Sequence, residues 1–227
     1  MSIDLKKDIK MNELVEGWDK KKELIMLVGF TYLCTYIYGR HLDYIWNMNL
    51  YRFLKALIKI LTMLPALFYL IKKKYNFKKL FIIRSGWEIV IGIIIALFIT
   101  SVLTTICVLQ GGELNFSISI GNAVYLIFHY FIIVALREEF IFRIAIMSCV
   151  EDNLKKHKAL APVITALIFS IWHIFNGTII QVVITFFSGL IFGCTLYFVK
   201  KCSFVSEVIG HGLYDFMVVY MNVIIDF

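Results

Sequence analysis

Ionisable side chains lie inside apolar stretches of this sequence. A charged side chain in the middle of a bilayer costs several kcal/mol, so such a residue needs a partner or a function. One stretch contains Arg137-Glu138-Glu139-Phe140-Ile141-Phe142-Arg143. Glu139 and Arg143 are four residues apart, which predicts an ion pair on one helix face. Glu138 lies about 140° around the helix from Arg143 and needs another partner, either Arg137 or a group on a neighbouring helix.

Two further apolar stretches carry histidines. One contains His173, and the other contains His211 and Asp215, which are four residues apart and share a helix face. A glutamate and a histidine that meet in a dehydrated pocket suit general-base activation of water. A second histidine could stabilise a developing oxyanion. Hydrolysis of a peptide bond requires both of these roles.

The same side chains offer an alternative chemistry. Two histidines and two carboxylates form an acceptable tetrahedral zinc set, and Glu138, His173 and His211 would be its main ligands, with Asp215 as the fourth. The sequence lacks the His-Glu-x-x-His motif of many zinc proteases. We therefore favour hydrolysis without a cofactor and retain zinc as the alternative.

The composition indicates which elements must position these groups. Of the 227 residues, 60% are hydrophobic and 17% are charged, and the mean hydropathy is +0.82. Soluble globular chains are about 45–50% apolar and about 25% charged, so a soluble domain is excluded. The apolar runs are continuous rather than alternating, which argues against a transmembrane barrel. We expect an all-α, polytopic bundle of about seven to eight transmembrane helices, with residues 1–227 in one membrane-embedded domain.

Seven apolar runs are candidate spans, at residues 24–39, 50–71, 88–110, 119–149, 159–176, 178–199 and 203–225. Seventeen basic residues lie in 1–22, 72–84, 155–158 and 200–201, whereas the loops on the opposite side contain only Arg40. The positive-inside rule places residues 1–22 and these basic loops in the cytoplasm. The sequence thus predicts a multi-pass protein of the cell membrane, in contact with lipids. We attribute its net charge of +7 to the basic loops on the cytoplasmic side of the membrane, and we expect no nucleic-acid partner.

The run at 119–149 is too long for one straight span. Its 31 residues would extend roughly 46 Å, so we expect tilt, projection or a break. Counted from the cytoplasmic ends of their runs, Glu138, His173 and His211 lie roughly 16, 21 and 12 Å deep, which places them in one layer. His129 is nine residues before Glu138, about 180° around a regular helix, so we expect a structural or lipid-facing role for it.

Taken in order, the polar motifs resemble those of a known family. Glu138-Glu139-x-x-x-Arg143, Phe169-x-x-x-His173 and His211-x-x-x-Asp215 are similar to the motifs of the CPBP family, which includes the CAAX prenyl endopeptidases and the bacteriocin-processing and self-immunity (Abi) proteins. The segment 186–193 resembles a further, glycine-containing motif of this family. The resemblance covers residues 120–216, which we interpret as a catalytic core.

The resemblance implies a role for each reactive side chain. Glu138 and His173 would activate the hydrolytic water, and His211 with Asp215 would support the oxyanion. Many family members have Asn at the position of Asp215. An ionised Asp cannot donate a hydrogen bond, so Asp215 would be protonated or would only orient His211.

Other motif residues are expected to support the site. By the same resemblance, Glu139 and Arg143 would hold their helix in place. Gly189 and Gly193 are four residues apart in an apolar helix, which predicts close helix packing. A cleft that admits an extended peptide is a second interpretation of the two glycines.

Three functions are compatible with these features. The first is an intramembrane endopeptidase that cuts a membrane-associated peptide or protein near the cytosolic face, in CAAX-type, bacteriocin or signal-peptide processing. The second is a non-catalytic bacteriocin self-immunity or partner-binding membrane protein. The third is a proton-coupled transporter, which ranks last because no transporter-like pair of interrupted helices is visible.

Overall fold

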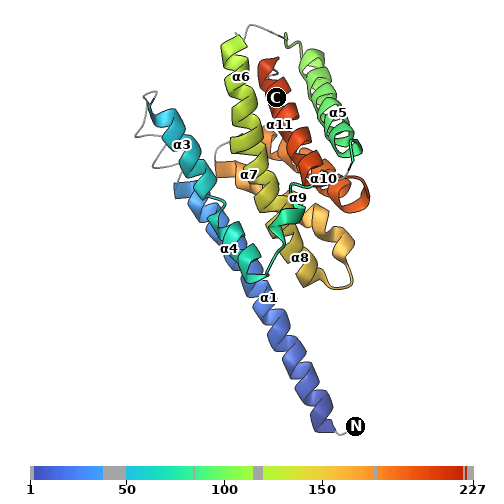
Figure 1. The fold of residues 1–227 in the computed structure, drawn as a ribbon. Helices are drawn as coiled ribbons and strands as arrows, with labels where there is room; N and C mark the ends of the chain where they lie inside the picture. Colours follow the sequence, from blue (N-terminus) through green and yellow to red (C-terminus); the bar gives the residue numbers. More distant parts are fainter. Residues whose placement is uncertain are drawn as a thin grey trace.

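The structure is a computed structural model that describes residues 3–37, 50–83, 85–114, 120–175, 178–221 and 223. These residues form helices and connecting turns, with no strand among them, which confirms the all-α class for this part of the chain. Figure 1 shows a bundle from which half of one long helix projects. Arg40 and Arg84, used in the topology prediction, lie outside the described residues.

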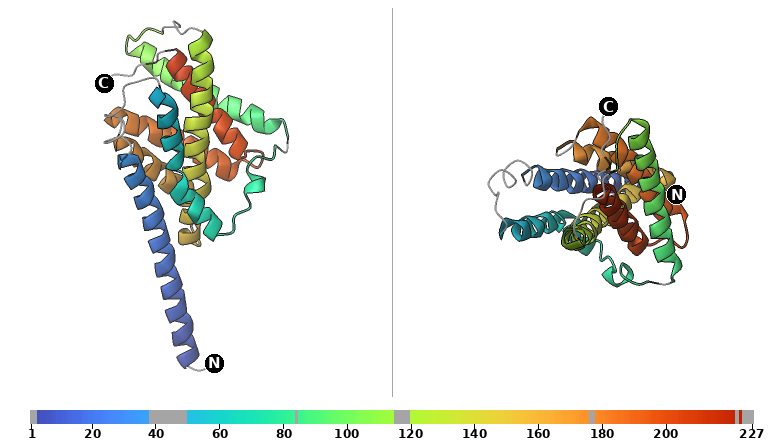
Figure 2. Two further views of the ribbon diagram at one scale, coloured as in Figure 1. Left: turned by 60° about the vertical axis from the view of Figure 1, so that its left-hand side comes forward. Right: turned by 90° about the horizontal axis from the view of Figure 1, so that it is seen from above.

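The first helix is longer than its apolar run. α1 (Ile3–Ile37) joins the predicted polar segment 1–22 to the first run, and its N-terminal part extends beyond the bundle (Figure 2). Where it meets the bundle, Lys72 Nζ donates to Glu23 Oε1 at 2.6 Å, and Lys73 bridges Glu23 and Asp152. The hydrogen bond from Lys72 lowers the pKa of Glu23. These ion pairs join α1 to α4 (Leu64–Lys72) and α8 (Met147–Leu154).

The predicted run at 50–71 is broken in the structure. α3 (Leu50–Leu61) and α4 are separated by a turn at Thr62 and Met63, and Pro65 lies at the start of α4. Proline suits the first turn of a helix but cannot continue a preceding one, because it lacks the N–H group. Neither piece reaches the roughly 20 residues that a span requires, so the count of seven spans stays a prediction.

Two helices in the described part are long and apolar enough to cross a bilayer, α5 (Trp87–Leu109) and α10 (Ile179–Phe198). They agree with the predicted runs 88–110 and 178–199. α9 (Ala161–Trp172) and α11 (Phe204–Tyr220) have 12 and 17 residues and are helical where the sequence predicts it. Both are shorter than the roughly 20 residues of a simple span.

The long run at 119–149 forms one continuous helical rod with two wider segments. It consists of α6 (Ile120–Phe128), a π-helical segment (His129–Ala135), α7 (Leu136–Glu139), a second π-helical segment (Phe140–Ile146) and α8. π-helical turns contain an extra residue and often occur at functional sites. Here they flank the four residues of α7 on both sides. Tilt, projection or a break was expected for this run. The structure shows a change of helix type at two places, and the rod stays continuous.

The hydrophobic core lies in two parts. One part is formed by α1, α4, α8, α9 and the second π segment, and includes Phe142, Phe169 and Trp172. The other is formed by α5, α10 and α11, and includes Leu103 and Tyr214. Leu103, Phe169, Trp172 and Tyr214 also line one cavity, which therefore lies between the two parts.

Glycines allow the closest helix contacts. A Cβ at Gly92 of α5 would lie 2.6 Å from the backbone oxygen of Ser206 in α11. On α10, a Cβ at Gly189 would lie 2.8 Å from the Phe169 ring, and one at Gly193 would lie 3.2 Å from the first turn of α9. Small residues permit such close approach of helices. The packing interpretation of Gly189 and Gly193 is therefore the one that the structure supports.

Gly92→Ala should lower the melting temperature of the detergent-purified protein. The added methyl group would meet a backbone oxygen, which can yield only if α11 moves, so we expect a loss of about 1–3 kcal/mol. Gly29→Ala in α1 is the matched control, because a Cβ there has nothing within 4 Å. It should leave stability unchanged or raise it slightly, since alanine favours helix. Equal melting temperatures for the two variants would contradict the close α5–α11 contact.

Candidate active site

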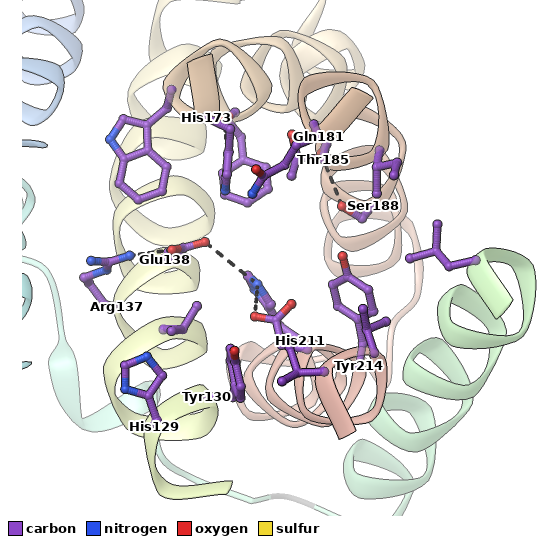
Figure 3. Close-up of a pocket in the computed structure, with 18 of the residues that line it drawn as sticks. His129, Tyr130, Arg137, Glu138, His173, Gln181, Thr185, Ser188, His211 and Tyr214 are labelled. Carbon is purple, nitrogen blue, oxygen red and sulfur yellow. Dashed lines mark hydrogen bonds and ion pairs between the residues drawn. The ribbon is translucent and has the colours of Figure 1, made fainter. Parts of the chain in front are cut away.

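One cavity brings together the four side chains that the sequence singled out. It has a volume of about 540 Å³, and its lining includes Glu138, His173, His211 and Asp215. Figure 3 shows Glu138 of α7 on one side, His173 from the end of α9 above, and His211 of α11 opposite Glu138 and below His173. Three separate helices thus supply groups to one volume. Their catalytic roles stay predictions.

Glu138 is held by the preceding arginine. Arg137 Nη2 donates to Glu138 Oε1 in a buried ion pair, so Arg137 is the partner that Glu138 requires. The Arg137 guanidinium carbon lies 5.3 Å from the centroid of the Trp172 ring, and Trp172 Nε1 donates to Thr35 Oγ1 at 2.7 Å. The second oxygen, Glu138 Oε2, lies 3.8 Å from His211 Nε2. One carboxylate oxygen is therefore anchored and the other faces His211.

His211 lies among three carboxyl groups. Its Nδ1 is 2.7 Å from Glu139 Oε1, and its Nε2 is 3.4 Å from Asp215 Oδ2 and 3.8 Å from Glu138 Oε2. An ionised carboxylate only accepts hydrogen bonds, so Nδ1 carries a hydrogen and donates it to Glu139. This bond fixes the imidazole ring and directs Nε2 toward Asp215 and Glu138.

The predicted ion pair between Glu139 and Arg143 is present. Arg143 Nε lies 3.2 Å from Glu139 Oε2, although its N–H is not aligned for a hydrogen bond, and both side chains are fully buried. The Arg143 guanidinium carbon lies 5.1 Å from the centroid of the Phe169 ring. The contact of Glu139 with His211 was not predicted, because the two residues are 72 positions apart and no local pattern links them.

His173 is oriented by its own helix. Its Nδ1 is 3.0 Å from the backbone oxygen of Phe169, and its ring stands edge-on to those of Phe169 and Trp172. A carbonyl oxygen only accepts, so Nδ1 is the donor and Nε2 of the neutral ring is an acceptor. Figure 3 shows the ring directed into the cavity.

His129 lines the same cavity as Glu138, so its predicted placement on the opposite side of the helix is wrong. A structural role for His129 stays a prediction. The predicted angle of 180° assumed a regular α-helix, whereas the π segment that begins at His129 advances by roughly 80° per residue. The smaller advance brings His129 within about a quarter turn of Glu138. Nothing in the sequence indicated this change of helix type.

Other lining residues lie outside the Glu138, His173 and His211 motifs. α10 presents Gln181, Thr185 and Ser188 at helical spacing toward the cavity (Figure 3). Thr35 of α1 and Leu103 of α5 close other parts of the wall. The i, i+4, i+7 spacing of Gln181, Thr185 and Ser188 was visible in the sequence and could have indicated a shared helix face. It did not single them out, because such uncharged polar side chains are common in apolar helices.

The zinc alternative uses the same side chains. Glu138 is paired with Arg137 through Oε1, and His211 Nδ1 is bonded to Glu139, which leaves Glu138 Oε2 and His211 Nε2 facing each other at 3.8 Å. Among the described residues, no group of three or more His, Cys, Asp or Glu side chains is arranged to hold a metal ion. A histidine that donates its Nδ1 hydrogen to a carboxylate can ligate zinc through Nε2, so hydrolysis without a metal stays a prediction.

The part of the chain that carries this site is similar to a known family. Residues 120–217 match the model of a family described as type II CAAX prenyl endopeptidase Rce1-like. This region is an Rce1-like domain of the CPBP family. No curated protein and no solved structure is significantly similar to the chain.

The Rce1-like domain extends from α6 into α11 and contains Glu138, His173, His211 and Asp215. Its family is one of membrane-embedded, CAAX-type endopeptidases, in agreement with the two apolar helices α5 and α10. α1 and α5 lie outside the Rce1-like domain, yet Thr35 and Leu103 complete the wall of its cavity.

Proposed function

We propose that the chain is an intramembrane endopeptidase in which Glu138 and His173 activate water and His211 stabilises the oxyanion. The observation that supports it is the convergence of a carboxylate, a histidine with an accepting nitrogen and a second, carboxylate-bound histidine on one cavity. General-base and oxyanion functions need separate groups on the two sides of the scissile carbonyl. This cavity offers a candidate group for each function within an Rce1-like domain.

The reaction would begin with a water molecule between His173 Nε2 and Glu138 Oε2. One of these groups removes a proton as the water oxygen attacks the carbonyl carbon. The oxyanion accepts a hydrogen bond from Nε2 of His211, which Asp215 orients. The proton then passes to the leaving nitrogen as the C–N bond breaks, and an acid and an amine are released.

The buried charges are consistent with this assignment. Glu138 faces Arg137, Glu139 faces Arg143, and Asp215 faces His211. If His211 is an imidazolium, these three carboxylates are balanced by three cations, as burial of charge requires. Asp215 then acts as an acceptor that orients His211, which explains why Asp can stand where many family members have Asn.

The substrate that we propose is a membrane-associated peptide or protein cut near the cytosolic face. A leader-bearing peptide, as in bacteriocin or signal-peptide processing, fits a site carried by a multi-pass protein of the cell membrane. The distribution of basic residues supports a cytoplasmic N-terminus, by the positive-inside rule. Membrane lipids are the other partner. CAAX-type processing remains the activity indicated by the family itself.

The test compares membrane peptides from cells that carry the intact chain, Glu138→Gln or Glu151→Gln, matched for expression. Glu151, at the end of α8, is not among the lining residues and serves as the control. A specific peptide should disappear, and its precursor accumulate, only with Glu138→Gln. Identical peptide profiles with a retained immunity phenotype would instead support a non-catalytic immunity protein.

The proposed mechanism uses no metal ion. Purified protein should therefore contain no stoichiometric zinc, and chelators should not reduce cleavage. Stoichiometric zinc that is lost in His173→Ala would overturn this part of the proposal. The measurement is elemental analysis of both proteins after purification without added metal.

A further inference from the structure

Glu207 is a fully buried carboxyl group that the proposed reaction does not use. It lies in the first turn of α11, outside the family motifs and outside the lining of the cavity. Its Oε1 lies 3.0 Å from Thr195 Oγ1 and accepts a hydrogen bond from Cys202 Sγ at 2.8 Å. Its Oε2 is buried without a hydrogen-bond partner. A buried carboxyl with neutral partners needs a physical reason for its presence.

The position of Glu207 relates it to His211. The two residues are four apart on α11 and therefore lie on the same face, one turn from each other. Glu139, which accepts the Nδ1 hydrogen of His211, and Arg143 are both close enough to act electrostatically on Glu207. Glu207 is thus a neighbour of the contact that orients the imidazole ring.

Glu207 and its two charged neighbours, Glu139 and Arg143, carry most of the buried polar atoms that lack a hydrogen-bond partner. Eight buried side-chain nitrogen or oxygen atoms in the described part lack a hydrogen-bond partner, and five of them belong to Glu139, Arg143 and Glu207. Buried polar networks in which few hydrogen bonds are made depend strongly on the charge of each member. The charge of Glu207 therefore affects how the electrostatic attraction of Arg143 is divided between Glu139 and Glu207.

Two observations favour the neutral form of Glu207. Among the described residues, Glu138, Glu139 and Asp215 each have a cationic partner within ion-pair distance, whereas the two side chains hydrogen-bonded to Glu207, Thr195 and Cys202, are neutral. The helix dipole in the first turn of α11 favours a negative charge, but this effect is smaller than the cost of burying an unpaired ion.

The hydroxyl of Thr195 gives the second observation. Thr195 Oγ1 lies 2.8 Å from the backbone oxygen of Ile191 and 3.0 Å from Glu207 Oε1. A hydroxyl has a single hydrogen, so when it is donated to the helix carbonyl, the contact with Glu207 needs a hydrogen from the carboxyl group. A carboxylic acid supplies this hydrogen and a carboxylate does not.

We propose that Glu207 is a neutral carboxylic acid that positions His211. It holds the first turn of α11 against α10 through Thr195, and it leaves the charge of Arg143 to Glu139, which in turn fixes the imidazole. Its effect on catalysis rests on the proposed peptidase function. Its protonation state and its effect on the His211 ring do not.

Infrared spectroscopy tests the protonation state directly. The purified full-length protein should show the carbonyl stretch of a protonated carboxylic acid, sensitive to deuterium exchange, and Glu207→Gln should remove it. Thr165→Val, in an equally buried polar residue of α9, is the control and should keep the band. A spectrum that is unchanged in Glu207→Gln would overturn the neutral assignment.

Kinetics and NMR test the positioning role. Glu207→Gln keeps a neutral hydrogen-bonding group, so kcat should stay within about threefold, whereas Glu207→Leu should lower kcat by at least about 30-fold with KM within about twofold. The Nδ1–H resonance of His211, assigned by its loss in His211→Gln, should persist in Glu207→Gln and shift or vanish in Glu207→Leu.

The outcomes separate this proposal from the proposed function. Equal losses of kcat in both Glu207 variants, or an unchanged His211 resonance in Glu207→Leu, would overturn the positioning role. A Glu207→Leu protein with normal kcat and a lower melting temperature would show a structural role only. If the intact chain cleaves no peptide, the peptidase function fails, and the infrared and NMR signals still decide the state and role of Glu207.

Discussion

Glu138→Gln should lower kcat for cleavage of a reporter peptide by about 10³-fold, within the usual range for loss of a general base. The amide has almost the same size and its oxygen can still accept the hydrogen bond from Arg137, so the geometry around α7 is kept. It cannot take a proton from water at Oε2, the atom that faces His211 at 3.8 Å. KM should change little, since the loss falls on the transition state.

The control for this prediction is Glu151→Gln, which removes a carboxylate at the end of α8 and should keep full activity. Purification yield, elution volume and melting temperature should be measured for both variants. A Glu138→Gln protein that is folded and retains more than about a tenth of the activity would exclude Glu138 as the base. His173 would then be the remaining candidate for the base.

Arg143→Leu should destabilise the protein by about 3–5 kcal/mol, because it leaves Glu139 as a fully buried charge without its cationic partner. The loss would be measured as a lower yield of monodisperse protein and a lower melting temperature in detergent. The side chain also packs over Phe169, close to Gly189 of α10, so the damage should extend to the α9–α10 contact.

A double variant isolates the electrostatic cause. Glu139→Gln combined with Arg143→Leu removes both charges and should recover stability to within about 1–2 kcal/mol of the intact chain. Lys72→Leu serves as the exposed counterpart, because the Lys72 side chain is 69% exposed in its pair with Glu23. It should cost less than about 1 kcal/mol. A double variant no more stable than Arg143→Leu would show that packing dominates.

Local geometry made part of the site predictable. The four-residue spacing of Glu139 and Arg143 was enough to predict their ion pair, since i, i+4 neighbours meet on any helix. Arg137 was one of two partners considered for Glu138 because it is the adjacent cation in the sequence. The apolar runs at 88–110 and 178–199 are single long helices because nothing within them interrupts the helix.

Contacts between distant parts of the chain were not predictable in this way. The bond between Glu139 and His211, and the placement of Glu207 behind it, depend on how α11 docks against α7 and α10. His129 was misplaced because a regular helix was assumed where the chain forms a π segment. The turn at Thr62 and Met63 had a signal in Pro65, but the apolar side chains around it obscured the break.

The two π-helical segments determine which way α7 faces. Each contains an additional residue compared with the same length of α-helix. Winding the seven residues of either segment as regular α-helix, at about 100° instead of about 80° per residue, would turn Arg137, Glu138 and Glu139 by roughly 140° relative to one end of the rod. The helix type of the two segments therefore sets the direction in which these three side chains point, and so determines which neighbours they meet.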